Sequence, residues 1–488
     1  MTRPVLLSEH SRIALMHESG LTPPRKAPQF IAAFVSTLSA VCLGMVFSWS
    51  SSAIPILEKE FAITTAQGAW VGSLVTLGAF VGAIPAGPMA QLTGRKRALQ
   101  ILIIPLLSSW ILIAFFCKYI WVLYIARFLA GISSGGISVA APMYVTELAH
   151  VSIRGTLGTF FQVQITIGIL FEYLLGDIIS DIRTLSLISA VLPVVFLLSF
   201  AFIPESPVYL CEKAKLQDAQ RSLLWFRGKD YEIDDELVKI TEDIEESKRN
   251  KTKLFEIFKC KATYKGLIIS FGLMAFQQLS GVNAVLFYTN KIFQQSGGSL
   301  SPGQCSILVG AVQVIASLIT TVLIDRAGRK ILLTVSSLAM SICLAALGLY
   351  FYFSNFMNPR ALSFVPLVSV TGFMASFSIG FGPIPWMIMG EILSPKSRTF
   401  LSSLAASINW LLAFLITNQF ANLVNFVGIG PTFLGFSVIC GLSTIFVLSL
   451  VEETKGRSQK EVAHLLAGNY QSALYSETLI IICPDIEN

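Results

Sequence analysis

The sequence predicts an all-α membrane protein with twelve transmembrane helices, arranged as two pseudo-symmetric six-helix halves joined by a short intracellular helical loop. The chain of 488 residues is 54% hydrophobic and only 13% charged, whereas soluble domains average about 25% charged residues. Several uncharged runs exceed the ~20 residues that a helix needs to cross a bilayer. Thr399–Val451, for example, contains no Asp, Glu, Lys or Arg and is long enough for two crossings.

Twelve apolar runs define the expected spans and domains. The spans of the first half cover residues 30–52, 68–90, 98–117, 122–143, 156–176 and 184–203. Those of the second half cover residues 265–289, 304–324, 331–353, 363–389, 400–421 and 431–451. The domains are a cytosolic tail (1–28), a six-helix half (29–203), a helical loop (204–263), a second half (264–451) and a cytosolic tail (452–488).

The loop between the halves is expected to form short surface helices packed under the bundle. Ser206–Phe226 and Asp234–Arg249 are helix-forming stretches with charges of both signs. The apolar positions in the first stretch favour packing over a flexible linker, which is the alternative. These positions are Leu216, Leu223, Leu224 and Trp225.

Basic residues in the short loops set the expected orientation, because cytosolic loops carry an excess of Lys and Arg. With both ends inside, the cytosolic loops hold Arg95, Lys96, Arg97, Arg154, Arg326, Arg329, Lys330, Lys396 and Arg398. The outer loops hold only Lys59, Lys118, Arg183, Lys291 and Arg360. We therefore expect a multi-pass plasma-membrane protein with both termini in the cytosol.

Charged motifs recur in the two halves in the same order. The first half carries Gly94-Arg95-Lys96, then Glu147 and Arg154 with six residues between them, and then Pro204-Glu205-Ser206. The second half carries Gly328-Arg329-Lys330, the same spacing from Glu391 to Arg398, and Glu453-Thr454. Basic inner loops are common in polytopic proteins, but they do not explain the shared Glu-to-Arg spacing. The pattern indicates duplicated halves related by an axis along the membrane normal.

The repeated charges lie at the expected cytosolic ends of the spans and are candidates for gating. Salt bridges there are expected to hold the inner ends of the halves together when the protein is open outward. The alternative is that they anchor helix ends to lipid headgroups. The charged gating candidates are Arg95, Glu147, Arg154, Glu205, Arg329, Glu391, Arg398 and Glu453.

The seventh span contains an unusual cluster of polar side chains in the sequence FQQLSGVNAVLFYT, residues 276–289. Neutral amides both donate and accept hydrogen bonds, so they suit an uncharged ligand rich in hydroxyls. Gln278 and Asn283 lie about 140° apart on an ideal helix, so a bend near Ser280–Gly281 is expected to bring them together. Interrupted helices are the usual construction of transporter sites. The alternative is that the amides only bond neighbouring helices.

Together these motifs resemble the sugar-porter branch of the major facilitator superfamily, over about residues 30–457. Matching pieces are Gly87-Pro88, Gly94-Arg95-Lys96, Arg127-x3-Gly131, Pro142-x-Tyr144-x2-Glu147, Arg154-Gly155, PESP (204–207), QQLSGVN (277–283), Asp325-Arg326-x-Gly328-Arg329-Lys330, GPIPW (382–386), Asn409-Trp410 and Glu453–Arg457. Within the branch, the chain looks most like insect facilitated trehalose transporters and facilitative glucose transporters. The resemblance implies the major facilitator fold and transport of a neutral sugar, a hexose or trehalose, by alternating access.

The resemblance also implies individual roles. Sugar-binding residues would be Gln162, Gln277, Gln278, Asn283, Gln313, Trp386, Asn409 and Trp410, with Tyr288, Pro383 and Pro385 as gating residues. An indole such as Trp386 can pack against the apolar face of a pyranose while its N–H stays available. The prolines remove backbone donors and loosen the helix. Four positions depart from the family pattern. Gln313 stands in place of asparagine, Gln91 and Ser378 stand in place of acidic residues, and Glu452 stands where a proline would normally precede Glu453-Thr454.

Uniport is the preferred mechanism, and proton-coupled symport or a non-transporting sugar receptor are the alternatives. Symport needs a carboxyl group that titrates inside the membrane, but Ala27–Leu57 has no acid. Glu172 is expected to be a solvated acid near the outer interface. A receptor would favour a long specialised tail, whereas Glu452–Asn488 is short. No grouping of nucleophile and base suggests an enzyme. We expect a monomer in a lipid bilayer with a small sugar as ligand, and no cofactor, metal or nucleic acid.

Overall fold

The computed structural model describes residues 24–150, 152–249, 261–296, 300–353, 362, 364–393, 398–457 and 459–467. Its regular elements within these ranges are all helices. Twelve candidate spans are long and apolar enough to cross a membrane. The all-α fold with twelve transmembrane helices is therefore confirmed. Most of the two expected tails lies outside the described residues.

The first half contains six spans, the last of which is built from two consecutive helices. They are α2 (Ala27–Glu60), α3 (Thr65–Thr93), α4 (Arg95–Phe116), α5 (Ile120–Leu148), α6 (Arg154–Ile178), and α7 (Ile182–Ser189) followed by α8 (Val191–Phe200). Helix α2 extends past residue 52, where the sequence led us to end the span. Its polar segment Ser50–Ser52 is buried against other helices rather than exposed as a loop.

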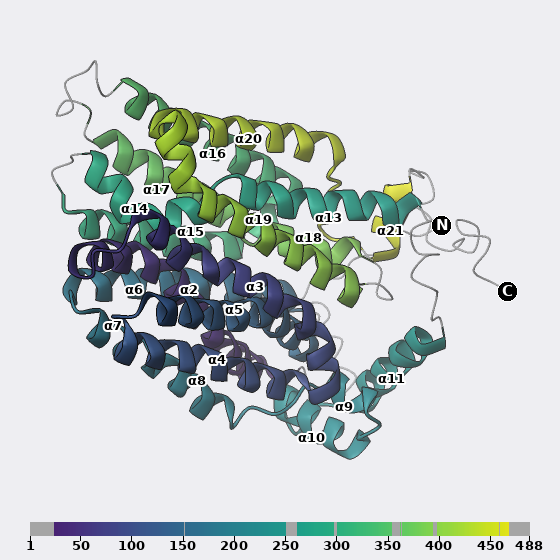
Figure 1. Ribbon diagram of the computed structural model, residues 1–488. Coiled ribbons are helices and arrows are strands. Elements are labelled where there is room, and N and C mark those ends of the chain that lie inside the picture. Colours follow the sequence, from purple (N-terminus) through teal and green to yellow (C-terminus); the bar gives the residue numbers. More distant parts are fainter. Residues whose placement is uncertain are drawn as a thin grey trace.

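The second half also contains six spans, two of which are interrupted. They are α13 (Lys261–Leu279) with α14 (Val282–Ser296), α15 (Pro302–Ala327), α16 (Arg329–Phe353), α17 (Phe364–Ile379) with α18 (Ile384–Ile392), α19 (Arg398–Val427) and α20 (Ile429–Leu450). In Figure 1 the purple-to-blue first half lies below the green-to-yellow second half. The halves meet mainly where α3 packs against α19, α6 against α15 and α2 against α14.

The remaining helices lie together at one end of the bundle, on the right in Figure 1. They are α9 (Pro207–Glu212), α10 (Leu216–Arg227), α11 (Asp234–Arg249) and α21 (Gln459–Ala467). We call this the loop end and the opposite end the far end. The expected loop helices are confirmed, but only part of their expected packing is. Leu223 is fully buried, whereas Leu216 is 48% and Trp225 39% exposed, because the bundle covers only one face of α10.

Candidate functional site

The polar stretch of the seventh span is bent where the sequence predicted it. Helix α13 ends at Leu279 and α14 begins at Val282. Between them, Gly281 has φ +81°, in the left-handed region that favours glycine. A Cβ atom there would also lie 2.7 Å from the Phe436 ring. The bend places Asn283 so that its Nδ2 donates to Gln278 Oε1 at 2.6 Å.

The amides on either side of this bend belong to one buried hydrogen-bond network. Gln278 Nε2 donates to Asn409 Oδ1 at 2.9 Å. Asn409 Nδ2 donates in turn to Gln277 Oε1, also at 2.9 Å. Gln277 Nε2 donates to the carbonyl oxygens of Phe381 and Gly382 at 2.6 and 3.0 Å. Each amide in this network can exchange a protein partner for a ligand hydroxyl, because it both donates and accepts.

The network reaches a second break, between α17 and α18. Helix α17 ends at Ile379 and α18 begins at Ile384, with Pro383 at its N-cap. Trp386 is therefore in the first turn of α18, where it is partly buried. Gln162 of the first half lies beside this break, since a Cβ atom on Gly382 would be 3.4 Å from the Gln162 Cδ.

Trp410 of α19 connects the amide network to residues of the first half. Its indole Nε1 donates to Ser138 Oγ of α5 at 3.3 Å. Its ring also packs against Phe47 of α2, with centroids 5.6 Å apart. The sequence reasoning missed Ser138 and Phe47. A signal for Ser138 was available, since it follows the small polar run Ser133–Gly136 within an apolar span.

Gln313 and Tyr288 are not joined to the amide network. Both are buried, and within the described residues Gln313 Oε1 and the Tyr288 hydroxyl have no hydrogen-bond partner. Tyr288 has non-helical dihedral angles (φ −112°, ψ 15°) inside α14, and its ring packs on Phe420 at 5.1 Å. Buried polar atoms without partners are uncommon, so both side chains remain candidates for contacting a ligand or water.

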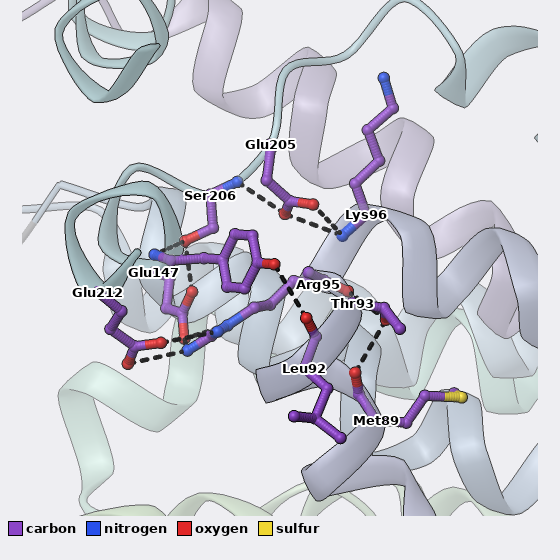
Figure 2. Close-up of polar contacts among 11 residues, drawn as sticks. Met89, Leu92, Thr93, Arg95, Lys96, Glu147, Glu205, Ser206 and Glu212 are labelled. Atoms are coloured by element: carbon purple, nitrogen blue, oxygen red, sulfur yellow. Dashed lines mark hydrogen bonds and ion pairs between the residues drawn. The ribbon is translucent and has the colours of Figure 1, made fainter. Parts of the chain in front are cut away.

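Charged residues form a compact network at the loop end of the first half, drawn in Figure 2. The Arg95 guanidinium pairs with Glu147 at 2.9 Å and with Glu212 of α9 at 3.0 Å. Glu147 also accepts a hydrogen bond from Ser206 Oγ. Glu205 accepts from the backbone N–H groups of Ser206 and of the first turn of α4, each at 2.9 Å. This network fixes α4, α5 and α9 to one another.

The second half repeats these contacts almost bond for bond. Arg329 pairs with Glu391 at 3.0 Å, and Glu391 accepts from Thr454 Oγ1 at 2.5 Å. Glu453 accepts from the backbone N–H groups of Arg329 and Lys330 at 2.9 and 3.1 Å. Burial opposes ionisation of Glu453, but hydrogen bonds from backbone N–H groups outweigh it and hold its pKa below the usual value. The repeat found in the sequence thus corresponds to a repeated structure.

In this structure the ion pairs run within each half, whereas the expectation that the loop-end charges join the halves concerns the outward-open state. The pairs of Arg95 and of Arg329 each connect helices of a single half. Arg154 donates to the carbonyl oxygen of Ala149 at 3.3 Å, again within one half. Arg398 begins α19, but its side chain lies outside the described residues. The reason is local: α4 and α5, like α16 and α18, are neighbours within their own half.

At the far end, by contrast, polar contacts do cross between the halves. Lys291 Nζ pairs with Glu58 Oε1 at 2.6 Å, and both side chains are only about a quarter exposed (24% and 27%). The backbone N–H and the side-chain amide of Asn290 donate to Ser51 Oγ and to the Ser51 carbonyl, both at 3.1 Å. We call these four residues the far-end latch. The sequence reasoning treated Lys291 only as a loop charge.

Glu172 is placed differently from the sequence-based expectation. It is fully buried in α6 rather than solvated, and its Oε2 accepts from Ser189 Oγ at 3.0 Å. Arg127 of α5 is also fully buried. The Arg127 guanidinium donates to Ser50 Oγ at 2.7 Å and lies over the Trp49 ring at 4.7 Å. The sixth span covers Glu172, because Ser189 of α7 packs against the face of α6 that carries Glu172.

Comparisons with known proteins agree with this arrangement. The model of the family described as "Sugar (and other) transporter" matches residues 18–466. A facilitated trehalose transporter Tret1 of Bombyx mori is 38% identical over 435 residues, which cover 89% of this chain and 86% of the relative. The Tret1 of Apis mellifera ligustica is 36% identical over 453 residues, covering 92% and 90%.

A solved structure gives the same fold. The proton:xylose symporter XylE, in a structure with bound 6-bromo-6-deoxy-D-glucose, matches with a TM-score of 0.77. The match covers 90% of this chain and 99% of that one, at 22% sequence identity. At this level of identity the likeness establishes the major facilitator fold alone.

Proposed function

This chain belongs to the sugar transporter family, and we propose that it moves an uncharged sugar across the plasma membrane by facilitated diffusion. The observation that carries the proposal is the buried network of Gln277, Gln278, Asn283 and Asn409. It offers paired donors and acceptors without net charge, which matches the hydroxyls of a sugar and disfavours ionic ligands. Trp386 and Trp410 add aromatic surface for the apolar face of a pyranose ring.

Hexoses and trehalose are the proposed substrates, and trehalose is favoured. Both present hydroxyl groups that alternate with apolar ring faces, so both suit the same set of amides and indoles. The preference for trehalose rests on the relatives, which are named facilitated trehalose transporters and share 36–38% identity with this chain. The structure supports the broader class: the uncharged amides and indoles of the site suit a neutral sugar, and they do not distinguish trehalose from a hexose.

Alternating access is the proposed mechanism, with the loop end in the cytosol. The two halves carry duplicated charge networks at the loop end and a polar latch at the far end. In this structure the latch joins the halves at the far end, while the charge networks stay within each half. We propose that opening toward the far end breaks the latch and brings the loop ends together. The arginine-rich turns at the loop end support a cytosolic location.

Transport is expected to be independent of a proton gradient. The first span has no acid before Glu58, so it offers no carboxyl group at the depth where a coupled proton would bind. Uptake of a panel of labelled mono- and disaccharides into proteoliposomes, with and without an imposed pH gradient, measures this. We expect saturable uptake of at least one neutral sugar with the same initial rate in both conditions.

Proton-coupled symport is the second candidate, and the burial of Glu172 is the observation that favours it. A carboxyl group inside the membrane is a functional candidate by default. Uphill accumulation that collapses with a protonophore and is lost in Glu172→Gln would establish coupling through this residue. Glu60→Gln is the matched control, because Glu60 is an exposed acid at the end of α2. Absence of uptake for every neutral sugar would contradict sugar transport itself.

A further inference from the structure

A second pocket lies at the loop end, away from the amide network. It has a volume of about 640 Å³ and lies between the first turn of α4, the chain that follows α8, and helices α9 and α10. Four basic and two acidic side chains contribute to its lining. They are Lys96, Arg97, Lys215 and Arg221, with Glu205 and Asp218. The transport mechanism proposed above gives this pocket no role.

The charges of the pocket leave it electropositive. Glu205 is already engaged, since it accepts hydrogen bonds from backbone N–H groups. Asp218 lies 3.8 Å from Arg221 and offsets part of its charge. Among the described residues, Arg97 and Lys215 form no ion pair, and both are exposed. The pocket therefore presents free cationic groups that suit a phosphate-bearing ligand.

The pocket lies beside exposed apolar residues of a membrane span. Arg97 lies on the same face of α4 as Ile101 and Ile104, which are 44% and 59% exposed. Because α4 is a candidate membrane span, this face is expected to meet acyl chains, and Arg97 lies in the first turn of the span. Phe202 is 84% exposed beside the pocket, and Trp225, which lines it, is 39% exposed. Tryptophan is enriched at this level of membrane proteins.

We propose that this pocket binds the headgroup of an anionic phospholipid from the adjacent leaflet. The lipid phosphates contact Arg97, Lys215 and Arg221, while the acyl chains follow the exposed side of α4 at Ile101 and Ile104. Basic pockets beside membrane spans at the cytosolic surface recognise such headgroups. The proposal rests on the membrane orientation given above and not on the identity of the transported sugar. The same charges could hold a soluble phosphate compound, but the apolar rim favours the lipid.

The test measures binding of phosphatidylinositol 4,5-bisphosphate to the full chain in a neutral detergent, by native mass spectrometry. The double variant Arg97→Gln/Arg221→Gln removes two pocket charges. Lys229→Gln/Lys239→Gln is the matched control, because it removes two exposed charges from the same loop outside the pocket lining. We expect the pocket variant to bind the lipid at least about tenfold more weakly, given the contribution of each basic residue near a membrane surface. The control is expected to bind like the unmodified protein.

Soluble inositol 1,4,5-trisphosphate and phosphatidylcholine distinguish the source of the ligand. Weak binding of both supports an anionic lipid held by headgroup and chains together. Binding of the soluble headgroup as tightly as the lipid would overturn the assignment to a membrane lipid. Unchanged lipid binding in Arg97→Gln/Arg221→Gln, or an equal loss in the control, would show that the pocket is not the site.

Discussion

Gln278→Ala is expected to weaken sugar affinity by roughly 1–3 kcal/mol, the range for leaving buried polar groups unpaired. Gln278 is the link between Asn283 on one side of the bend and Asn409 of α19. Alanine therefore removes a donor and an acceptor at once and leaves both neighbouring amides short of a partner. The change corresponds to about a 5- to 150-fold increase in Kd, measurable by calorimetric titration of the purified protein with the transported sugar.

Gln419→Ala provides the matched control for this experiment. Gln419 lies on α19 like Asn409, but it is exposed, and its hydrogen bonds among the described residues are to Asn418 and Asn422 of its own helix. The substitution Gln419→Ala is therefore expected to leave sugar affinity unchanged. If Gln278→Ala bound sugar as tightly as the unmodified protein while keeping normal membrane expression, the assignment of Gln278 to the binding site would be wrong.

Lys291→Gln is expected to shift the protein toward the state that is open at the far end. Lys291 and Glu58 form an ion pair between the halves that is only about a quarter exposed, so each partner stabilises the closed far end. A substitution shifts a two-state equilibrium only through its different effect on the two states. A contribution of ~1–3 kcal/mol would change the ratio of states about 5- to 150-fold. Single cysteine reporters at each end, labelled from each side, measure the shift.

Two other variants make this result specific. Lys59→Gln removes an exposed positive charge next to Glu58 and is expected to leave the labelling pattern unchanged. Arg154→Ala is expected to act in the opposite direction, because the loop-end charges should stabilise the state in which the loop ends meet. Greater labelling at the loop end in Arg154→Ala supports that role. Identical labelling of Lys291→Gln and the unmodified protein would remove the latch from the mechanism.

Much of the fold was predictable because hydropathy and glycine chemistry act locally. The twelve spans follow from runs of apolar residues whose length is set by the bilayer. The bend at Ser280–Gly281 follows from a glycine between amides that have to converge, and Gly281 adopts the expected left-handed conformation. The repeat was also predictable, because the short motif Gly-Arg-Lys occurs in both halves at the turn where the next helix begins.

Partners from distant parts of the chain could not be predicted in the same way. Glu172 was expected to be solvated because its position along α6 is near the membrane boundary. It is buried together with Ser189, which belongs to another helix and donates to its carboxylate. Likewise, the sequence around Lys291 gives no indication that its ion-pair partner is Glu58. Hydropathy gives the depth of a residue in the membrane but does not say which helix it faces.

Counterflow tests the central claim most directly, namely that a neutral sugar crosses by facilitated diffusion through this protein. Proteoliposomes are loaded with a high concentration of unlabelled trehalose or glucose and diluted into a trace of the labelled sugar. The account predicts that labelled sugar accumulates transiently inside, and that a protonophore does not change this overshoot. No overshoot with any neutral sugar, or an overshoot that the protonophore abolishes, would contradict it.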